Sequence, residues 1–564
     1  MMHRTPFRNP GISLASLLLL AFPAMATAQY GEPPPPAAYA LENVTVVHAN
    51  GREEPGVNVV VRRGLIFAMG VGAVIPADAL VLEGDSLKVY PGLVDAHGGV
   101  ELDLPTMENM GEVLSWDPPR EAQGFTPHRL AANYLGVGGS ELGSERNAGV
   151  IAAGVHPEGG MAPGQGAAIL FRRTTKTPRD LVVRPRLGLF FSFQGARGGY
   201  PSSLFAVIAH FRQMFEDAGR YGLIMSEYAR DPVGMTLPRW DPDFEALRDA
   251  ASGNLPVFFL ADDDEDIRRV LNLSDEIGFQ LLILGGEEAW QVADELAARN
   301  IPVLLSVAFP KPTDWNPTDE GGEEEVMSAS QDELEPAAAR EKERLENAYA
   351  TAARLTEAGV TVALTSGGGE GNLREGARKA MEYGLSEGDA LRAITTTPAF
   401  LLGMPHLTTL GPGMAANFIV CDGPLLEDET EIRYTFVEGE LEKGREARPS
   451  GDGETPSVDV SGAWEVVLNA QGMEMTFTMS LTQDGSSFSG SMSGGEMGEA
   501  QIENGVVSGN SLTFAIVFSM GTESLEVDSS ATVTGDRMSG SGTGAMGSFT
   551  FTATRRPGAE GGIR

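Results

Sequence analysis

The sequence predicts an α/β protein with a parallel sheet or barrel, followed by a separate all-β domain. In the segment 91–400, fully apolar runs such as Val257–Leu260 and Leu281–Leu284 alternate with helical stretches, a pattern typical of strands covered by helices on the outside. In the segment 459–557, apolar residues alternate with polar ones, as in Met473–Leu481. This period of two predicts antiparallel strands with one buried face, in a barrel or sandwich of roughly six to eight strands.

Two kinds of unusual composition divide the chain further. Residues 1–28 are typical of a secretory signal, with two arginines before a short apolar core and Ala26-Thr27-Ala28 as the cleavage site. Residues 29–40 are rich in proline and predict an extended linker, and residues 446–458, rich in Gly, Pro, Ser and charge, predict a second linker. We therefore expect an exported bacterial protein, periplasmic or secreted, without a membrane span.

The charge and the residue counts exclude several classes of function. Asp and Glu outnumber Lys and Arg by 78 to 41, which gives a formal net charge of −37. Such a surface repels phosphate backbones, so nucleic acid is excluded as the expected partner. The single cysteine, Cys421, forms no intramolecular disulfide and no Cys-rich zinc site. The chain has only seven histidines, so few imidazoles are available as metal ligands.

Two segments, in the right order along the chain, resemble the amidohydrolase superfamily. Val89–His97 resembles the opening of that family's barrel. Gly384–Val420 resembles the closing helix and the return to a small sandwich, with Asn417 where the family usually has Asp. The glycine-rich stretch Gly149–Gly166 is most similar to imidazolonepropionase-like and related secreted members.

The resemblance covers residues 41–445 and implies how they are organised. It implies a (β/α)8 barrel at 91–400, TIM-like in its arrangement. It also implies a small β-sandwich assembled from 41–90 and 401–445. The first of these two pieces contains β-branched runs on either side of Asn50-Gly51, a dipeptide typical of hairpin turns.

The resemblance also implies a chemistry, which is metal-assisted hydrolysis of amide or related bonds. One or two divalent ions, zinc or similar, activate water at the carboxyl ends of the barrel strands. The family ligands are a His-x-His pair on the first strand, one His on each of strands five and six, and an Asp on strand eight. Only His97 remains here, and the other four positions are substituted, by Gly99, Leu260, Gly285 and Gly367. A lone imidazole does not hold a catalytic divalent ion tightly.

Acidic residues beside the expected strand ends leave an unusual metal site open. Oxygen ligands would favour Ca²⁺ or Mg²⁺ over zinc. The alternative is that these acids are solvated loop residues and that His97 is a structural histidine. The acids are Asp262, Asp263 and Asp264 after the fifth strand, and Glu101 and Asp103 after His97.

Three further residues have weaker claims to a role. His128 and His156 lie in expected loops, and their spacing does not connect them to the site. Ser386 stands in a match to the G-x-S-x-G nucleophile elbow, but that elbow requires a preceding strand. Ser386 is placed at a predicted helix start, so we expect it to be a helix N-cap.

Two functional hypotheses follow. The favoured one is a family member with a degenerate metal centre that binds a small-molecule ligand, or a paralogous amidohydrolase subunit, without hydrolysis. The alternative is a metal-dependent hydrolase of non-peptide C–N bonds, amide or cyclic amide, that uses an atypical site. Family membership favours the alternative, and the substituted ligand positions favour the binding role.

Overall fold

The structure of the chain is a computed structural model. The expected signal segment 1–28, the first part of the expected linker 29–40 and nearly all of the linker 446–458 lie outside the residues that the structure describes. The described residues are 36–82, 86–105, 116, 118–138, 142–196, 199–310, 331–443, 458–470, 473–485, 487–494, 499–520, 523–544 and 547–556.

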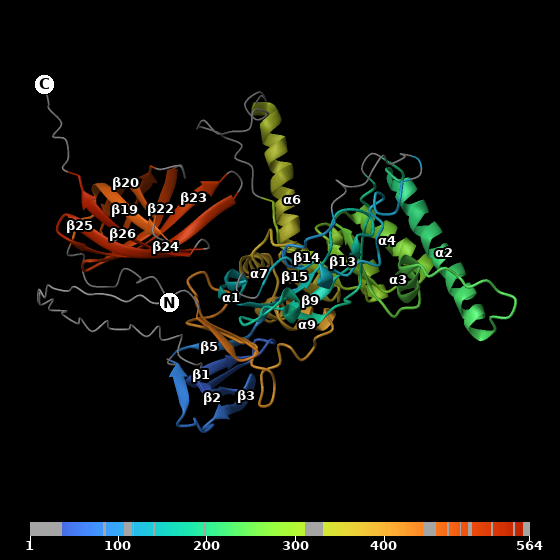
Figure 1. Cartoon of the computed structure of the whole chain (residues 1–564), viewed down its shortest axis with the longest axis horizontal. Coiled ribbons are helices and arrows are strands. Elements are labelled where there is room, and N and C mark those ends of the chain that lie inside the picture. Colours follow the sequence, from blue (N-terminus) through green and yellow to red (C-terminus); the bar gives the residue numbers. More distant parts are fainter. Residues whose placement is uncertain are drawn as a thin grey trace, which may run out of the picture.

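One eight-stranded sheet joins the two ends of the α/β region, and Figure 1 shows its N-terminal strands gathered beside β5. Its order is β18-β17-β16-β5-β1-β2-β3, with β4 paired to β1. The predicted hairpin turn at Asn50-Gly51 is confirmed, since β1 and β2 pair antiparallel around it and Gly51 has a φ of +78°. The strands are β1 (Ala38–Val47), β2 (Glu53–Arg62), β3 (Leu65–Val71), β4 (Ala79–Leu82), β5 (Lys88–Pro91), β16 (Phe418–Cys421), β17 (Ile432–Val437) and β18 (Glu440–Lys443).

The predicted apolar runs form parallel strands. β11 to β15 pair in sequence order as parallel neighbours, and β6 pairs parallel with β7. Their side chains are almost all buried on both faces, as the lack of alternation predicts. The strands are β6 (Leu93–Asp95), β7 (Val150–Val155), β11 (Leu189–Ser192), β12 (Val257–Ala261), β13 (Leu281–Gly285), β14 (Val303–Ser306) and β15 (Val362–Thr365).

The expectation of uniformly parallel strands is wrong for one segment. β8 (Gly164–Gln165) pairs antiparallel with β11, and β9 (Ala167–Leu170) pairs antiparallel with β7 and with β10 (Val182–Arg184). The reason lies in the connection that leads into it. A parallel crossover takes about a dozen residues or more, and the glycine-rich link 156–163 between β7 and β8 is too short to carry one.

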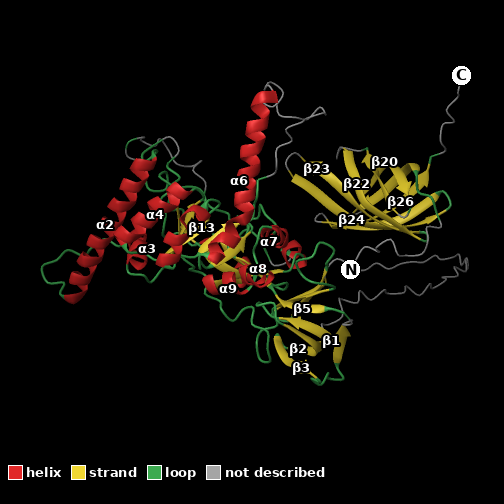
Figure 2. Ribbon diagram, turned by 180° about the vertical axis from the view of Figure 1, so that it is seen from behind, coloured by secondary structure: helices red, strands yellow, loops and turns green. Residues whose placement is uncertain are grey.

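Helices surround the parallel strands, and Figure 2 shows α4, α7, α8 and α9 around β13. Ser386 caps α8, because its hydroxyl accepts a hydrogen bond from the backbone N–H of Asp389 at 3.2 Å. This confirms the helix-cap interpretation of the G-x-S-x-G match. The helices are α1 (Gly143–Asn147), α2 (Leu204–Arg230), α3 (Pro242–Ala251), α4 (Asp264–Ile277), α5 (Ala293–Arg299), α6 (Gln331–Glu357), α7 (Leu373–Glu382), α8 (Glu387–Ile394) and α9 (Thr396–Leu401).

The last parallel strand meets the first through side-chain and loop hydrogen bonds. The Asp95 carboxylate accepts from the backbone N–H of Ser366 at 3.1 Å and of His97 at 3.0 Å. The Ser366 hydroxyl and the Gly368 N–H both donate to the His97 carbonyl, at 3.1 and 2.9 Å. These bonds hold the carboxyl end of β15 against that of β6.

The C-terminal segment is a closed antiparallel barrel of eight strands, which confirms the predicted all-β domain. Phe477, Met479 and Leu481, three of the alternating residues, are buried in its interior with Trp464. The strands are β19 (Gly462–Ala470), β20 (Met473–Asp484), β21 (Ser487–Ser493), β22 (Glu499–Ser508), β23 (Ser511–Met520), β24 (Glu523–Thr534), β25 (Arg537–Gly544) and β26 (Gly547–Arg555). Within the described part of the chain, no helix has the length and apolar character that crossing a bilayer requires.

The helix α2 offers a matched pair of phenylalanines that tests where the core lies. Phe211 is fully buried against the strands and Phe205 is 84% exposed. We expect Phe211→Ala to lower the free energy of unfolding by about 3–5 kcal/mol, because it leaves a cavity. We expect Phe205→Ala to change it by less than about 0.5 kcal/mol. Urea unfolding followed by far-UV circular dichroism measures both, and equal effects would contradict this placement of the core.

Candidate functional site

A cavity of about 220 Å³ lies where the carboxyl ends of several parallel strands meet. We call it the strand-end cavity. Four of the residues singled out from the sequence as family ligand positions line it together, namely His97 after β6, Leu260 on β12, Gly285 on β13 and Gly367 after β15. Carboxyl ends of parallel strands share one edge, which explains this convergence. Asp262, the candidate oxygen ligand, lines the same cavity.

The fifth family ligand position, Gly99, lies against the loop that follows β15. A Cβ added at Gly99 would lie 2.3 Å from the Gly368 carbonyl oxygen and 2.6 Å from the Gly369 Cα. These are backbone atoms, which do not move aside as a flexible side chain does. The space that the second imidazole of a His-x-His pair would need is therefore filled by the Gly368-Gly369 backbone.

Neighbours also fill the space at the two glycines inside the cavity. Gly285 has a φ of +90°, and a Cβ there would lie 2.2 Å from the Asp262 carboxylate. Gly367 has a φ of +70°, and a Cβ there would meet the Ser306 hydroxyl at 2.3 Å. A positive φ disfavours any side chain with a Cβ. Both positions are thus shaped for glycine by backbone conformation and by contact.

His97 is buried, with 7% of its surface exposed, and its Nε2 has no hydrogen-bond partner among the described residues. The nearest acid is Glu158, whose Oε1 lies 3.5 Å from Nε2. That distance exceeds the roughly 2.8 Å of a charge-assisted hydrogen bond. The contact with His97 nevertheless lowers the pKa of the Glu158 carboxyl below its usual value.

The histidine that sequence reasoning left unconnected, His156, lies beside His97. Their ring centroids are 5.4 Å apart, and the His156 ring also contacts Phe258 and Phe190. Its Nε2 donates to the Ala96 carbonyl at 3.0 Å. Burial, with the neighbouring His97 as a second cause, lowers the pKa of His156 to about 3, so it is neutral near pH 7. Its place directly after the apolar run Val150–Val155 is the signal that would have located it.

The acids predicted as possible oxygen ligands separate into different roles. Asp263 caps α4 by accepting from the Asp266 N–H at 2.7 Å, and Asp264 pairs with Arg268. Glu101 and Asp103 are exposed loop residues, and the Asp103 carboxylate lies beside Gly136. Only Asp262 lines the strand-end cavity, where the walls shield it from water and the Glu287 carboxylate opposes a second negative charge, so both raise the pKa of Asp262.

The residues present do not fit the metal centre that the family resemblance implies. Within the described ranges, no three His, Cys, Asp or Glu side chains are grouped so that they could share one metal ion. Four ligand positions lack a donor. At Gly99 the backbone leaves no room for a side chain, and at Gly285 and Gly367 a positive φ disfavours one. A structural or catalytic divalent ion normally needs three or four protein ligands.

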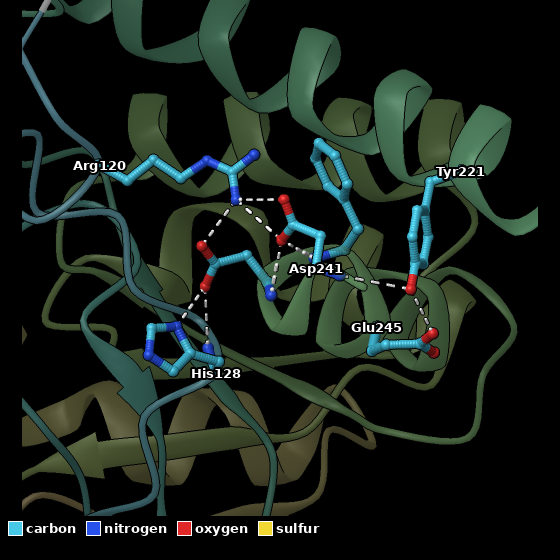
Figure 3. A network of polar contacts seen from close by, with 7 residues as sticks. Arg120, His128, Tyr221, Asp241 and Glu245 are labelled. Atoms are coloured by element: carbon cyan, nitrogen blue, oxygen red, sulfur yellow. Dashed lines mark hydrogen bonds and ion pairs between the residues drawn. The ribbon is translucent and has the colours of Figure 1, made fainter. Parts of the chain in front are cut away.

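The other loop histidine, His128, lies in a separate polar network (Figure 3). Its Nδ1 contacts the Asp243 carboxylate at 2.5 Å, and Arg120 donates to Asp243 at 2.8 Å and to Asp241 at 2.9 Å. Asp241 caps α3 and also receives these bonds from the loop, so the network ties the loop around residues 120–128 to α3. Within this network His128 has a positioning role and makes no contact with His97.

A larger cavity, of about 610 Å³, lies on the outer side of β6. Asp95 of β6 and Glu145 of α1 line it, together with Arg374 of α7. Burial, and secondarily the Asp95 charge, raise the pKa of Glu145. Arg374 donates to the carbonyls of Leu425 and Thr430, so its guanidinium is used to hold the chain. The larger cavity therefore follows the strand junction. Of the family ligand positions only Gly99 lines it, and Glu370 lines both cavities.

Comparisons with known proteins agree with the predicted family. Residues 276–444 match the model of the amidohydrolase family. An amidohydrolase from Thermotoga maritima has a similar fold, with a TM-score of 0.57, 22% sequence identity, and coverage of 72% of this chain and 100% of that chain. The ochratoxinase of A. niger is also similar, at a TM-score of 0.40 and 14% identity over 74% of this chain and 98% of that chain. No curated protein sequence matches this chain.

The backbone contact at Gly99 predicts the cost of a side chain there. We expect Gly99→Ala to lower the free energy of unfolding by about 1–3 kcal/mol, because the methyl group overlaps the Gly368 carbonyl. Gly219 on α2 is the control, since a Cβ there meets no atom within 4 Å. Gly219→Ala is expected to be neutral or stabilising by up to about 1 kcal/mol. Urea midpoints compare the two, and a neutral Gly99→Ala would show that the backbone leaves room there.

The depressed pKa of His156 predicts a loss of stability in acid. Between pH 6.5 and about 3 the unfolded chain binds a proton at His156 while the folded chain does not. The free energy of unfolding therefore falls as the pH drops through this window, by roughly 5 kcal/mol at most. His156→Gln keeps a donor for the Ala96 carbonyl and is expected to lose this part of the pH dependence. His406→Gln, at an exposed site, should retain it, and identical pH profiles for all three proteins would contradict the assignment.

Proposed function

From the membership of residues 276–444 in the amidohydrolase family, we propose that this chain is a non-hydrolysing member that binds a small molecule in the strand-end cavity. We further propose that its metal centre is degenerate. The same non-hydrolysing role fits a chain that associates, as a subunit, with a paralogous amidohydrolase.

One observation supports the proposal most directly. At three of the substituted ligand positions, neighbouring protein atoms lie where a side chain would begin. The Gly368-Gly369 backbone fills the space beside Gly99, the Asp262 carboxylate abuts Gly285, and the Ser306 hydroxyl abuts Gly367. Family hydrolysis needs metal-bound water, and metal-bound water needs several protein donors around one ion. A chain in which four of the five donors are absent, and in which neighbouring atoms occupy the space at three of those positions, retains the cavity and lacks the means of activating water.

Three finer proposals accompany this one. The two sheets of parallel strands are a (β/α)8-type barrel in which the segment 164–170 is the third strand, reversed in direction, because β12, β13 and β15 then count as strands five, six and eight. The similarity of Gly149–Gly166 supports a place among imidazolonepropionase-like members. The composition of residues 1–28 supports export to the periplasm or beyond.

Metal analysis and a hydrolysis screen on the purified full chain test the proposal together. After incubation with Zn²⁺, Mg²⁺ or Ca²⁺ and dialysis, we expect well below one metal ion per chain. We also expect no turnover of amide or cyclic amide substrates above the no-protein rate. His97→Ala should change neither result, because no ion depends on its imidazole.

The same experiment also tests the competing hypothesis of a metal-dependent hydrolase. Stoichiometric metal together with turnover, both lost in His97→Ala, would establish a metal-dependent hydrolase of C–N bonds with an atypical site and would refute the binding proposal. The exposed variant His406→Ala is the matched control for histidine removal, since His406 lies away from the cavity.

A further inference from the structure

The strand-end cavity has walls of one charge sign. Three carboxylates line it, those of Asp262, Glu287 and Glu370, and neither lysine nor arginine is among its lining residues. Within the described part of the chain, none of the three forms an ion pair with a basic side chain. Elsewhere in this structure carboxylates are commonly paired, as Asp264 is with Arg268. The cavity therefore keeps a negative charge that no protein group offsets.

The behaviour of Asp262 agrees with this uncompensated charge. The nearby backbone of Gly286 and Glu287 favours the charged form of its carboxylate. Removal from water and the Glu287 charge outweigh this effect, so the pKa of Asp262 is raised. A cation in the cavity would relieve the repulsion between these two carboxylates.

A second, independent feature points to a ligand with hydrogen-bond donors. His97 lines the same cavity, is more than nine-tenths buried, and its Nε2 lacks a hydrogen-bond partner among the described residues. A buried polar atom without a partner costs free energy comparable to a lost hydrogen bond. The nearest acidic atom to Nε2 is the Glu158 Oε1 at 3.5 Å. In the tautomer with its proton on Nδ1, the imidazole accepts a hydrogen bond at Nε2 from an N–H group of a ligand.

The remaining walls describe the rest of the ligand. Leu260, Leu305 and Phe309 give the cavity an apolar side. Its volume of about 220 Å³ is that of a site for a small molecule. The occupant is thus small, with an apolar body and one polar end.

We propose that the strand-end cavity binds a small organic cation, a primary amine or amidine with an apolar body, between the Asp262 and Glu287 carboxylates and His97. The proposal rests on the binding function proposed above and names the class of ligand. The ammonium group supplies the missing positive charge and an N–H donor for Nε2, and the hydrocarbon part lies against the leucines and Phe309. No covalent step is involved.

Cyclohexylamine and cyclohexanol form a matched pair of probes, since they share shape and size and differ in charge at neutral pH. Calorimetric titration of the full chain at low ionic strength measures both. We expect cyclohexylammonium to bind at least about tenfold more tightly than cyclohexanol, because charge-assisted contacts are stronger than neutral ones. We expect Asp262→Asn and Glu287→Gln each to weaken amine binding by about tenfold and to leave alcohol binding unchanged.

Glu216→Gln is the control for removal of one acid, because Glu216 is exposed on α2 and does not line the cavity. It should bind the amine as the unaltered chain does. Equal binding of the amine and the alcohol, no binding of either, or equal weakening by all three variants would overturn the proposal. None of these outcomes bears on the metal and turnover measurements. Failure of the amine class is therefore distinguishable from failure of the non-hydrolysing role.

Discussion

The structure of the site depends on the Asp95 carboxylate. It accepts backbone hydrogen bonds from His97, two residues ahead of it, and from Ser366 at the far end of the α/β region. Ser366 in turn donates through its hydroxyl to the His97 carbonyl. Burial raises the pKa of Asp95, and the hydrogen bonds from Ser366 and His97 oppose that rise. One side chain thereby fixes both the position of His97 and the path of the glycine loop after β15. This loop is what fills the space beside Gly99, so the junction between the first and last parallel strands also determines that the second imidazole has no place.

Much of the fold could be predicted because hydrophobic periodicity is a local property. The apolar runs at 257–260 and 281–284 and the alternation at 473–481 each indicate how many faces of a strand are buried, and all three segments form the strands expected. Strand direction depends on the connections between strands. The link 156–163 is too short for a parallel crossover, so its length indicates the antiparallel pairing of β8 and β9. The candidate site was predictable in part. Counting strands located Leu260, Gly285 and Gly367 at one cavity, but only coordinates show that Gly368-Gly369, Asp262 and Ser306 occupy the neighbouring space.

The role of His156 could not be predicted from its position in the sequence. Its position immediately after a buried strand resembles that of His97, and both side chains enter the same region. Yet His156 donates to the Ala96 carbonyl and is held neutral among Phe190, Phe258 and His97. A histidine after a barrel strand is therefore compatible with two opposite roles. The surroundings decide between them, because an aromatic shell excludes the charge and the water that a reactive site requires.

The net negative charge of the chain has a local counterpart in the carboxylates that line the strand-end cavity. In a metal-loaded relative of this fold, a divalent ion would offset carboxylates that face one another at the strand ends. Here the donor set is missing, yet Asp262, Glu287 and Glu370 still line the cavity without a lysine or arginine among them. Carboxylates gathered in this way repel one another, and the net charge of −37 adds a long-range field of the same sign. A monovalent organic cation needs fewer ligands than a metal ion, and it offsets this repulsion while its hydrocarbon part covers the apolar wall. The proposed absence of a metal ion and the proposed attraction for a small amine thus follow from the same arrangement, in which three carboxylates line a cavity where four of the five family ligand positions lack a donor.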